Sequence, residues 1–399
     1  MALMPVDEAK ALVLAGVKPK GIEKVALNEA LGRVLAVDLH ARHHQPPFTA
    51  SAMDGYAISS KDVSAGSQFR LIGTAAAGHP FRGKVEKGQA VRIFTGAVVP
   101  SGADAILIQE NASVEAGTVT SAAAVARGQY VRPCGLDFSK SQLLLKAGQR
   151  LSSRHIGLAA AMNNASLRVR RRPMTAILGT GDELAAPGRR LREGQIASSN
   201  NPALGAFVRW AGGDVFDLGI VPDDQQRIRA AIRRAYAADI LVITGGASVG
   251  DHDLVKASLE AEGIKLAFWK IAMRPGKPLM FAINRGMRIL GLPGNPVSSL
   301  ICARIFLKPL IDQFLGSPEQ DIPLKARLAL PMRANDQRQE YARGRLDHGK
   351  DGALIATPFV NQDSSMLRLL ADANCLIIRP PFAEPVPAGA QVPVLPLEF

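Results

Sequence analysis

Short apolar runs and helix-like segments alternate from Pro173 to about Leu315, and this alternation constrains the fold more than any other feature of the sequence. The runs MTAIL, DVFDLGIV, DILVIT and RILGL are typical of buried strands, and amphipathic segments such as DDQQRIRAAIRRAYA and LVKASLEAEG lie between them. Strands that alternate with helices form βαβ units around a largely parallel sheet. We therefore predict an α/β protein whose central domain, residues 173–316, has three layers and a mostly parallel sheet.

Glycine-rich or charged turns follow the predicted strands of this domain. They are GTGDEL (179–184), Pro222-Asp223-Asp224, TGGASVGDHD (244–253), Arg274-Pro275-Gly276-Lys277-Pro278 and PGNP (293–296). Any one of these segments is most simply an ordinary turn or a helix cap. Because parallel strands end at the same edge of a sheet, where α/β folds bind ligands, the set as a whole predicts a functional site.

The turn after DILVIT carries the most chemical information. Gly245, Gly246 and Gly250 lack Cβ atoms, so backbone N–H groups can approach an anionic ligand closely. Asp251 and Asp253 stand where the next helix begins, and aspartate at that position commonly caps the helix. One cap does not require two carboxylates, and a second carboxylate beside an anion site suggests a hard divalent cation such as Mg²⁺.

The chain is basic, with a formal net charge of +13 over 399 residues. Its arginines gather in three clusters, Arg168/Arg170/Arg171/Arg172, Arg189/Arg190/Arg192 and Arg227/Arg229/Arg233/Arg234, which we expect to be mostly solvated helix faces. The surplus favours an anionic substrate. Aromatic residues make up only 5% of the chain and do not interleave with the basic runs, so we expect no nucleic-acid partner.

Cysteine and hydrophobic content indicate the cellular environment. The three cysteines, Cys134, Cys302 and Cys375, have no CxxC spacing, which argues against a disulfide framework or a zinc site and predicts a reducing cytoplasm. The apolar stretch ALVLAGV, residues 11–17, is far shorter than the roughly 20 residues of a membrane helix. We expect an amphipathic helix there and no membrane association.

The remaining sequence predicts three further parts. Residues 50–137 alternate short strands with Gly/Pro turns and form an inserted β-rich domain. Residues 1–49 together with 138–172 form a discontinuous N-terminal helical linking domain, and residues 317–399 form a small C-terminal β-barrel. Helix starts are marked by asparagines before prolines, Asn200 and Asn201 before Pro202, and Asn295 before Pro296, where the asparagine side chains are expected to cap.

Seven motifs then match a known family in its own order. They are PPFTASAMDGYA (46–57), IFTGAVVPSGADAILIQE (93–110), VRPCGLD (131–137), GTGDEL, TGGASVGDHD, FWKIAMRPGKP (268–278) and GLPGNPVSS (291–299). Over essentially its whole length the chain resembles the molybdopterin molybdenumtransferases, the MoeA family, which is similar to the E domain of gephyrin. These enzymes insert molybdate into adenylylated molybdopterin and release AMP, the last step of molybdenum cofactor synthesis.

The resemblance implies a homodimer in which the β-rich domain of one subunit completes the cleft of the other. Asp54 and Thr95 would enter the site in this way as catalytic residues, joined by Arg132 and Asp137 as substrate-binding residues. Without the resemblance, Asp54 would be read as part of a D-G turn and Thr95 as a turn hydroxyl.

The resemblance also assigns roles at the sheet edge. Lys270 and Lys277 would be catalytic and, with Arg274, neutralise phosphate or oxyanion charge. The predicted Mg²⁺ ligands are Glu183, Asp223 and Asp253, of which Glu183 and Asp253 would also be catalytic, and Asp251 is left as the helix cap. The predicted substrate-binding residues are Gly245, Gly246, Ser248, Gly250, Arg274, Pro293, Asn295, Pro296, Arg132 and Asp137. Arg274 stands where the family often has lysine, and arginine cannot exchange a proton near neutral pH. Ser364 and Ser365 are read as loop serines.

Two other functions would use parts of the same sequence. A molybdopterin adenylyltransferase-like enzyme would share the α/β domain and its TGG turn but would be a short single-domain chain. A non-catalytic, gephyrin-like scaffold would not need the carboxylates Glu183, Asp223 and Asp253. The transferase function is therefore favoured, with the adenylyltransferase and molybdoenzymes as transient partners.

Overall fold

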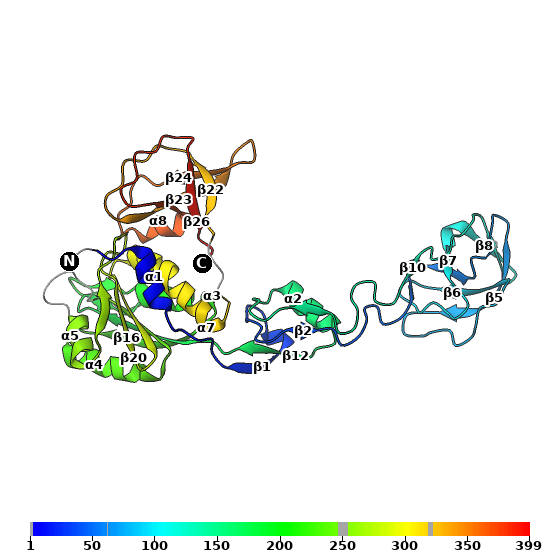
Figure 1. Ribbon diagram of the computed structural model, residues 1–399, viewed down its shortest axis with the longest axis horizontal. Helices are drawn as coiled ribbons and strands as arrows, with labels where there is room; N and C mark the ends of the chain where they lie inside the picture. The colour runs from blue at the N-terminus through cyan, green and yellow to red at the C-terminus, as the bar shows by residue number, and fades with distance from the viewer. Residues whose placement is uncertain (1–2, 62, 246–253, 318–321) are drawn as a thin grey trace. The chain divides into compact units, whose positions relative to one another are not determined.

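The computed structural model describes residues 3–61, 63–245, 254–317 and 322–399 (Figure 1). The chain divides into two compact units. Unit 1 comprises residues 1–23, 32–36 and 168–399, and unit 2 comprises residues 24–31 and 37–167.

The α/β domain of unit 1 is built on a mixed sheet with the strand order β16-β13-β17-β21-β20-β18. Its strands are β13 (Met174–Thr180), β16 (Asp214–Val221), β17 (Ile240–Thr244), β18 (Leu266–Trp269), β20 (Met280–Asn284) and β21 (Met287–Leu292). Strands β16, β13, β17 and β21 are parallel, whereas β20 is antiparallel to both β21 and β18. Strand β18 therefore runs in the same direction as β21, and the prediction of a mostly parallel sheet is confirmed.

Helices cover both faces of this sheet, as predicted. Alternate residues of β17 point to opposite sides: Ile240 and Val242 pack in one apolar core, Leu241 and Ile243 in the other. The first core also contains residues of α1 (Val6–Leu14), α3 (Asn200–Ala211), α6 (Pro296–Cys302) and α7 (Lys308–Leu315), and the second contains residues of α4 (Gln225–Arg234) and α5 (Leu254–Ala261). Burial on both faces explains why these strands read as continuous apolar runs.

The C-terminal part of unit 1 closes into a β-barrel, which confirms that prediction. Its strands are β22 (Leu324–Leu328), β23 (Gln339–His348), β24 (Leu354–Pro358), β25 (Cys375–Arg379) and β26 (Gln391–Pro396). The pairings run from β23 through β24, β22, β26 and β25 back to β23, so these strands have no free edge. The short β19 (Met273–Arg274) joins β23 in parallel, and α8 (Leu367–Asp372) lies between β24 and β25 in the chain.

Unit 2 contains a sheet with the order β7-β4-β6-β5-β9-β8 and a linking region. The elements are β4 (Gly55–Ile58), β5 (Gln68–Ala75), β6 (Gln89–Ile93), β7 (Ala105–Ile108), β8 (Ala112–Glu115), β9 (Thr118–Ser121), β3 (Ala50–Ser51), β10 (Val131–Arg132), β2 (Leu39–His40), β11 (Leu143–Leu145) and α2 (Ser153–Ala161). Strand β2 pairs with β11, so chain segments on either side of residues 50–137 lie side by side. The exact domain boundaries stay a prediction.

Two secondary-structure expectations were wrong. The predicted helical linking domain is not helical from residue 152 to 172, because α2 ends at Ala161 and β12 (Ser166–Arg170) follows, so Arg168 and Arg170 of the first arginine cluster lie on a strand and not on a helix face. The loop that contains Arg189, Arg190 and Arg192 is not a helix face but connects β14 (Leu184–Ala185) to β15 (Ile196–Ala197). Gly188 and Gly194 in this loop have φ values of +84° and +77°, which a helix cannot contain.

The arginines of the third cluster do lie on a helix, α4 and its end. Among the residues that the structure describes, no helix combines the length and apolar character needed to cross a membrane.

Candidate functional site

The turns that follow β13, β16, β17 and β21 meet at one edge of the sheet, as the sequence predicts. The backbone N–H of Asp223, after β16, donates to Oδ1 of Asp182, after β13, over 3.1 Å. Gly294 follows β21 and Gly245 follows β17, and a Cβ built on Gly294 would lie 3.7 Å from the Cα of Gly245. The site is therefore assembled from turns of separate strands rather than from one motif.

Gly245 is the tightest point of this edge. Its φ is +89°, and a Cβ built on it would lie 2.0 Å from the backbone oxygen of Thr180 at the end of β13. An L-side chain would be both conformationally strained and in collision with backbone. The TGG glycine thus allows two neighbouring strand ends to approach each other.

Asn200 links two of these turns, those after β17 and β21, a role that the sequence did not reveal. It was expected to precede a helix starting at Pro202, but α3 starts at Asn200, with Ser199 as the N-cap residue. Pro202 fits inside the first turn because the N–H groups there have no partner within the helix. The amide nitrogen of Asn200 donates to Thr244 Oγ1 (2.7 Å) and to the Gly294 oxygen (2.8 Å).

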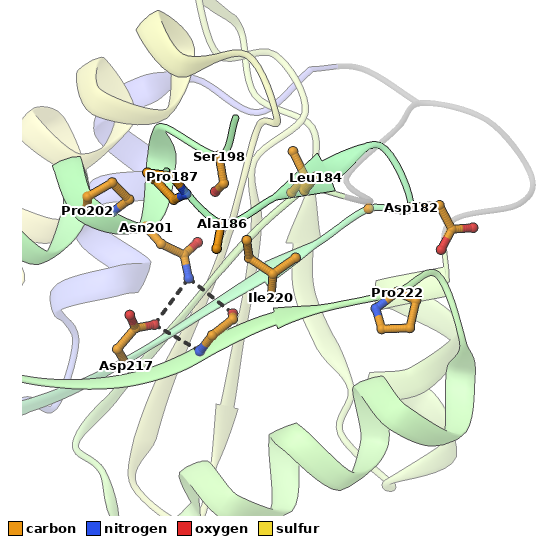
Figure 2. Close-up of a pocket in the computed structure, with 12 residues that line it drawn as sticks. Asp182, Leu184, Ala186, Pro187, Ser198, Asn201, Pro202, Asp217, Ile220 and Pro222 are labelled. Atoms are coloured by element: carbon orange, nitrogen blue, oxygen red, sulfur yellow. Dashed lines mark hydrogen bonds between the residues drawn. The ribbon is translucent and has the colours of Figure 1, made fainter. Parts of the chain in front are cut away.

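Asn201 belongs to the same helical turn and binds the neighbouring strand β16 (Figure 2). Its Nδ2 donates to Asp217 Oδ1 (3.2 Å) and to the Gly219 oxygen (3.1 Å), and the Gly219 N–H donates to the same Asp217 oxygen over 2.9 Å. The β13 to β16 register shifts between Ile177 and Leu178 at this point, and Gly219 has a φ of +79°. The shift leaves Leu218, directly after Asp217, without a partner on β13.

These residues line a pocket of about 550 Å³ beside the strand ends (Figure 2). The lining residues are Gly181, Asp182, Leu184, Ala186, Pro187, Ser198, Asn201, Pro202, Asp217, Gly219, Ile220 and Pro222. Its walls are largely apolar and its polar groups are few, which is the usual composition of a small-molecule site. A second cavity of about 850 Å³ is lined by the arginine-rich loop 189–195 and shares Ala186 with the first.

The predicted metal ligands Glu183 and Asp223 directly follow the pocket residues Asp182 and Pro222 in the chain. Partial burial, and then the negative charges of Asp182 and Glu183, raise the pKa of the Asp223 carboxyl above its ordinary value. The neighbouring Asp224 has a different role: its side chain accepts from the Arg227 N–H over 2.8 Å and caps α4. Crowded carboxylates whose ionisation is disfavoured provide a suitable environment for a cation.

Several predicted residues cannot be placed. Asp253, Gly246, Ser248, Gly250 and the cap candidate Asp251 lie outside the described residues. Within the described ranges, no three His, Cys, Asp or Glu side chains are arranged to hold a metal ion together. The metal set of Glu183, Asp223 and Asp253 therefore stays a prediction.

The predicted lysines differ in their surroundings. The Nζ of Lys270 lies 4.6 Å from the centre of the Trp269 ring, and so does the Nζ of Lys256 from α5. Lys277 is exposed. Two lysine ammonium groups thus contact the Trp269 ring at the end of β18, and cation–π contacts of this kind restrain lysine side chains.

Arg274 is engaged with the barrel. Its Nη2 donates to Glu340 Oε1 (2.7 Å) and Asn335 Oδ1 (3.2 Å), and its Nη1 lies 3.5 Å from Asp336 Oδ2. The hydrogen bond from Arg338, with a further contribution from Arg274, lowers the pKa of Asp336 to about 2. Predicted as an oxyanion ligand, Arg274 in this structure also connects β19 to the barrel.

Asn295 contacts the barrel rather than capping its helix. It is the N-cap residue of α6 by position, and Pro296 follows, but its side chain makes no capping bond. Instead Nδ2 donates to Ser364 Oγ over 2.7 Å. The loop that carries Ser364 is held by the buried Arg343, whose guanidinium donates to the backbone oxygens of residues 361, 363 and 366.

In unit 2 the structure brings Asp54 and Thr95 together. The backbone N–H and the hydroxyl of Thr95 both donate to Asp54 Oδ1, each over 2.7 Å. The Thr95 hydroxyl and then its N–H lower the pKa of Asp54, which stays ionised. Gly55 is required because a Cβ there would lie 2.1 Å from the Leu107 oxygen. Arg132 and Asp137 are exposed on the same unit.

All three cysteines are described, and none forms a disulfide. Cys134 is exposed, whereas Cys302 and Cys375 are buried. Burial raises the pKa of the Cys302 thiol, whose Sγ would lie 2.5 Å from a Cβ at Gly276 in the PGKP turn. Burial likewise raises the pKa of Cys375 to about 12.

Comparisons with known proteins agree with this architecture. Residues 4–163 match the MoeA N-terminal region (domain I and II), residues 176–313 a probable molybdopterin binding domain, and residues 325–397 the MoeA C-terminal region (domain IV). The molybdopterin molybdenumtransferase of Haemophilus influenzae is 32% identical over 99% of this chain and 98% of its own. The chain belongs to the MoeA family. A second MoeA relative, the molybdopterin molybdenumtransferase of Bacillus subtilis, is 34% identical over 98% of this chain and 94% of its own.

A solved MoeA structure has the same fold. The molybdopterin biosynthesis MoeA protein from Pyrococcus horikosii is 29% identical, covers 100% of both chains, and superimposes with a TM-score of 0.85. The family resemblance inferred from the seven motifs is thereby confirmed. The segment that matches the probable molybdopterin binding domain contains the pocket and the strand-end turns described above.

Proposed function

We propose that this chain inserts molybdate into adenylylated molybdopterin and releases AMP, completing molybdenum cofactor synthesis. The observation that carries the proposal is the sheet edge itself: a pocket of about 550 Å³ opens beside Asp182, and Asp182 is hydrogen-bonded to Asp223, whose pKa is raised. This edge lies in the segment that matches a probable molybdopterin binding domain, and full-length relatives carry the name of this transferase.

The proposed substrates require the residue types found at the edge. Adenylylated molybdopterin carries a pterin, a dithiolene and a phosphoanhydride to AMP, and molybdate is a dianion. Lys270 and Lys277 are proposed to neutralise phosphate or oxyanion charge, and the TGG backbone N–H groups to bind it. The thiolates of the dithiolene would then replace oxo ligands on molybdenum, which leave as water, and a separate water would cleave the phosphoanhydride to release AMP. The +13 charge of the chain favours the approach of both anions.

A divalent cation, Mg²⁺, is proposed as the cofactor. Asp223, Glu183 and Asp253 would hold it, and the raised pKa of Asp223 supports this because a cation would relieve the repulsion from Asp182 and Glu183. When bound there, Mg²⁺ would stabilise negative charge on the departing AMP phosphate.

A second copy of the chain is proposed to complete the site. The exposed side chains of Phe48 (39%), Met53 (39%), Phe94 (38%) and Leu136 (59%) accompany the turns that carry Asp54, Thr95 and Asp137. Exposed apolar side chains beside catalytic candidates support a buried interface at this face. We propose a cytoplasmic homodimer, which would receive its substrate from a molybdopterin adenylyltransferase and pass the cofactor to molybdoenzymes.

The activity is tested by mixing purified protein with adenylylated molybdopterin, molybdate and Mg²⁺ and measuring AMP. Molybdate-dependent AMP release is expected, and its absence would refute the transferase proposal and favour a scaffold. Pyrophosphate release from ATP with unmodified molybdopterin would instead indicate an adenylyltransferase.

Asp253→Ala and Asp54→Ala are each expected to abolish turnover without unfolding the chain. A mixture of the two variants should regain activity if residues of one copy complete the site of the other. Asp224→Asn, which alters only the α4 cap, is the matched control and should retain turnover.

A further inference from the structure

The pocket at the β13 and β16 edge is suited to a flat, uncharged ring rather than to a phosphate. Its apolar walls are formed by Leu184, Pro187, Pro202, Ile220 and Pro222. Of the residues that the structure describes, no lysine or arginine lines it. Its side-chain polar groups are mainly oxygen acceptors, so a fitting ligand must bring hydrogen-bond donors.

Asp217 is an exposed acceptor that lines the pocket beside Asn201 (Figure 2). Its Oδ1 already accepts two hydrogen bonds, from the Gly219 N–H and from Asn201 Nδ2. Within the described part of the chain, its Oδ2 has no hydrogen-bond partner, so both lone-pair positions of that oxygen are open. The two bonds to Oδ1 fix the carboxylate in place.

Asn201 fixes the Asp217 carboxylate rather than offering a further acceptor. The residue is only 7% exposed, and its Oδ1 lies against β13, where a Cβ on Gly179 would be 2.6 Å away. Its amide is therefore held by packing with Nδ2 directed at Asp217. Asp217 Oδ2 is the carboxylate oxygen left open to a ligand edge that carries N–H groups.

We propose that Asp217 determines which ring enters this pocket: its Oδ2 accepts the adjacent N–H groups of a 2-amino-4-oxo-pyrimidine edge, as found in a pterin. The inference rests on the proposed function, because it selects the pterin of adenylylated molybdopterin over the adenine. Adenine presents one donor beside one acceptor, so its acceptor would face the carboxylate. The pterin edge presents two adjacent donors and leaves no such repulsion.

The substitution Asp217→Asn tests this assignment because its geometry is determined. The amide oxygen must stay at the Oδ1 position, where two donors point at it, so the NH₂ group takes the place of Oδ2. The variant then offers donors to the ligand where the native chain offers an acceptor. Both donors of a pterin edge then face a donor, whereas a lumazine, which has a 2-oxo group in place of the 2-amino group, offers an acceptor beside N3–H and is repelled less.

The experiment measures binding of 6-hydroxymethylpterin and 6-hydroxymethyllumazine to the full chain by ligand fluorescence. The native chain should bind the pterin at least about 10-fold more tightly, the effect of one hydrogen bond to a charged group. Asp217→Asn should reverse the preference. Asp214→Asn changes a carboxylate on the same strand that pairs with Arg172 outside the pocket, and it should leave the native preference unchanged.

Retained or improved lumazine binding by Asp217→Asn shows that the pocket is still folded. An unchanged preference, or an equal loss of both ligands, would overturn the assignment. The measurement uses neither molybdate nor AMP, so a failure of the transferase assay and a failure of pterin selection are separate results.

Discussion

Gly245→Ala tests whether the strand ends approach as closely as the structure indicates. An alanine at φ +89° pays about 1–2 kcal/mol for its backbone conformation. Its Cβ would also lie 2.0 Å from the Thr180 oxygen, and the backbone shift needed to relieve this overlap costs about 1–3 kcal/mol. We therefore expect the free energy of unfolding of the α/β domain to fall by about 2–5 kcal/mol.

Gly263→Ala is the matched control. Gly263 also has a positive φ, +73°, but no atom of a described residue lies within 4 Å of its hypothetical Cβ. The control pays for backbone conformation alone, about 1–2 kcal/mol, and both variants lose the same unfolded-state entropy. The difference between the two variants therefore isolates the contact with Thr180.

Urea denaturation followed by tryptophan fluorescence suits this measurement, because both tryptophans of the chain, Trp210 on α3 and Trp269 on β18, lie in the α/β domain. With a urea dependence of about 2 kcal/mol per molar, Gly245→Ala should lower the midpoint by about 1–2.5 M and Gly263→Ala by about 0.5–1 M. Equal midpoints for the two variants would show that β17 and β13 do not meet at this point.

Three further predictions concern charged groups. The Glu262 carboxylate accepts hydrogen bonds from Arg233, Arg229 and Tyr236. The bonds from the two arginines lower its pKa from 4.5 to about 2, so Glu262→Gln should destabilise the chain at neutral pH. A carboxyl whose pKa is lowered by folding stabilises the native state at pH values above its unfolded-state pKa, and this stabilisation is lost as the pH falls toward its folded-state pKa. The difference in unfolding free energy between wild type and variant should therefore shrink between about pH 4.5 and about pH 2. A difference that stays constant over this range would contradict the prediction. Because its pKa is raised, the Asp223 carboxyl takes up a proton at a higher pH than an ordinary aspartate. When AMP release is titrated with Mg²⁺, the apparent Mg²⁺ affinity of the native chain should therefore weaken on mild acidification. The affinity of Asp223→Asn should change less. Arg274→Lys should lose the simultaneous contacts with Glu340 and Asn335. Because the Arg274 side chain is 39% exposed, the free energy of unfolding should fall by at most about 1 kcal/mol. A much larger loss of stability in thermal unfolding would show that this is not a surface ion pair.

The strand-end turns could be predicted from the sequence because their signal is local. A buried run followed by glycine and acidic residues marks the carboxyl end of a strand, and parallel pairing brings those ends together. Asp182, Asp223 and Gly245 were located in this way, and Asp224 was correctly read as a possible cap. Asp54 and Thr95 could be predicted as site residues only from the family resemblance, because a D-G turn and a turn threonine are common in any chain.

The partners made by tertiary contacts could not be predicted. Asn200 and Asn201 look like capping residues in the sequence, and only the start of α3 two residues before Pro202 directs them to β17 and β16. Asn295 has the capping position but binds Ser364, which is distant in the chain. Asp217 sits within an apolar strand, and its contact with Asn201 of α3 has no signal in the sequence.

The burial of two of the three cysteines has a practical consequence. Thiol reagents attack the thiolate, and burial raises the pKa of Cys302 and of Cys375, so these two side chains are both inaccessible and protonated. Cys134 is exposed and lies in the VRPCGLD segment, between the predicted substrate-binding residues Arg132 and Asp137. The unaltered chain is thus already suited to single-site labelling. A spin label on Cys134 would measure how far apart this segment lies in two associated copies, with no engineered cysteine.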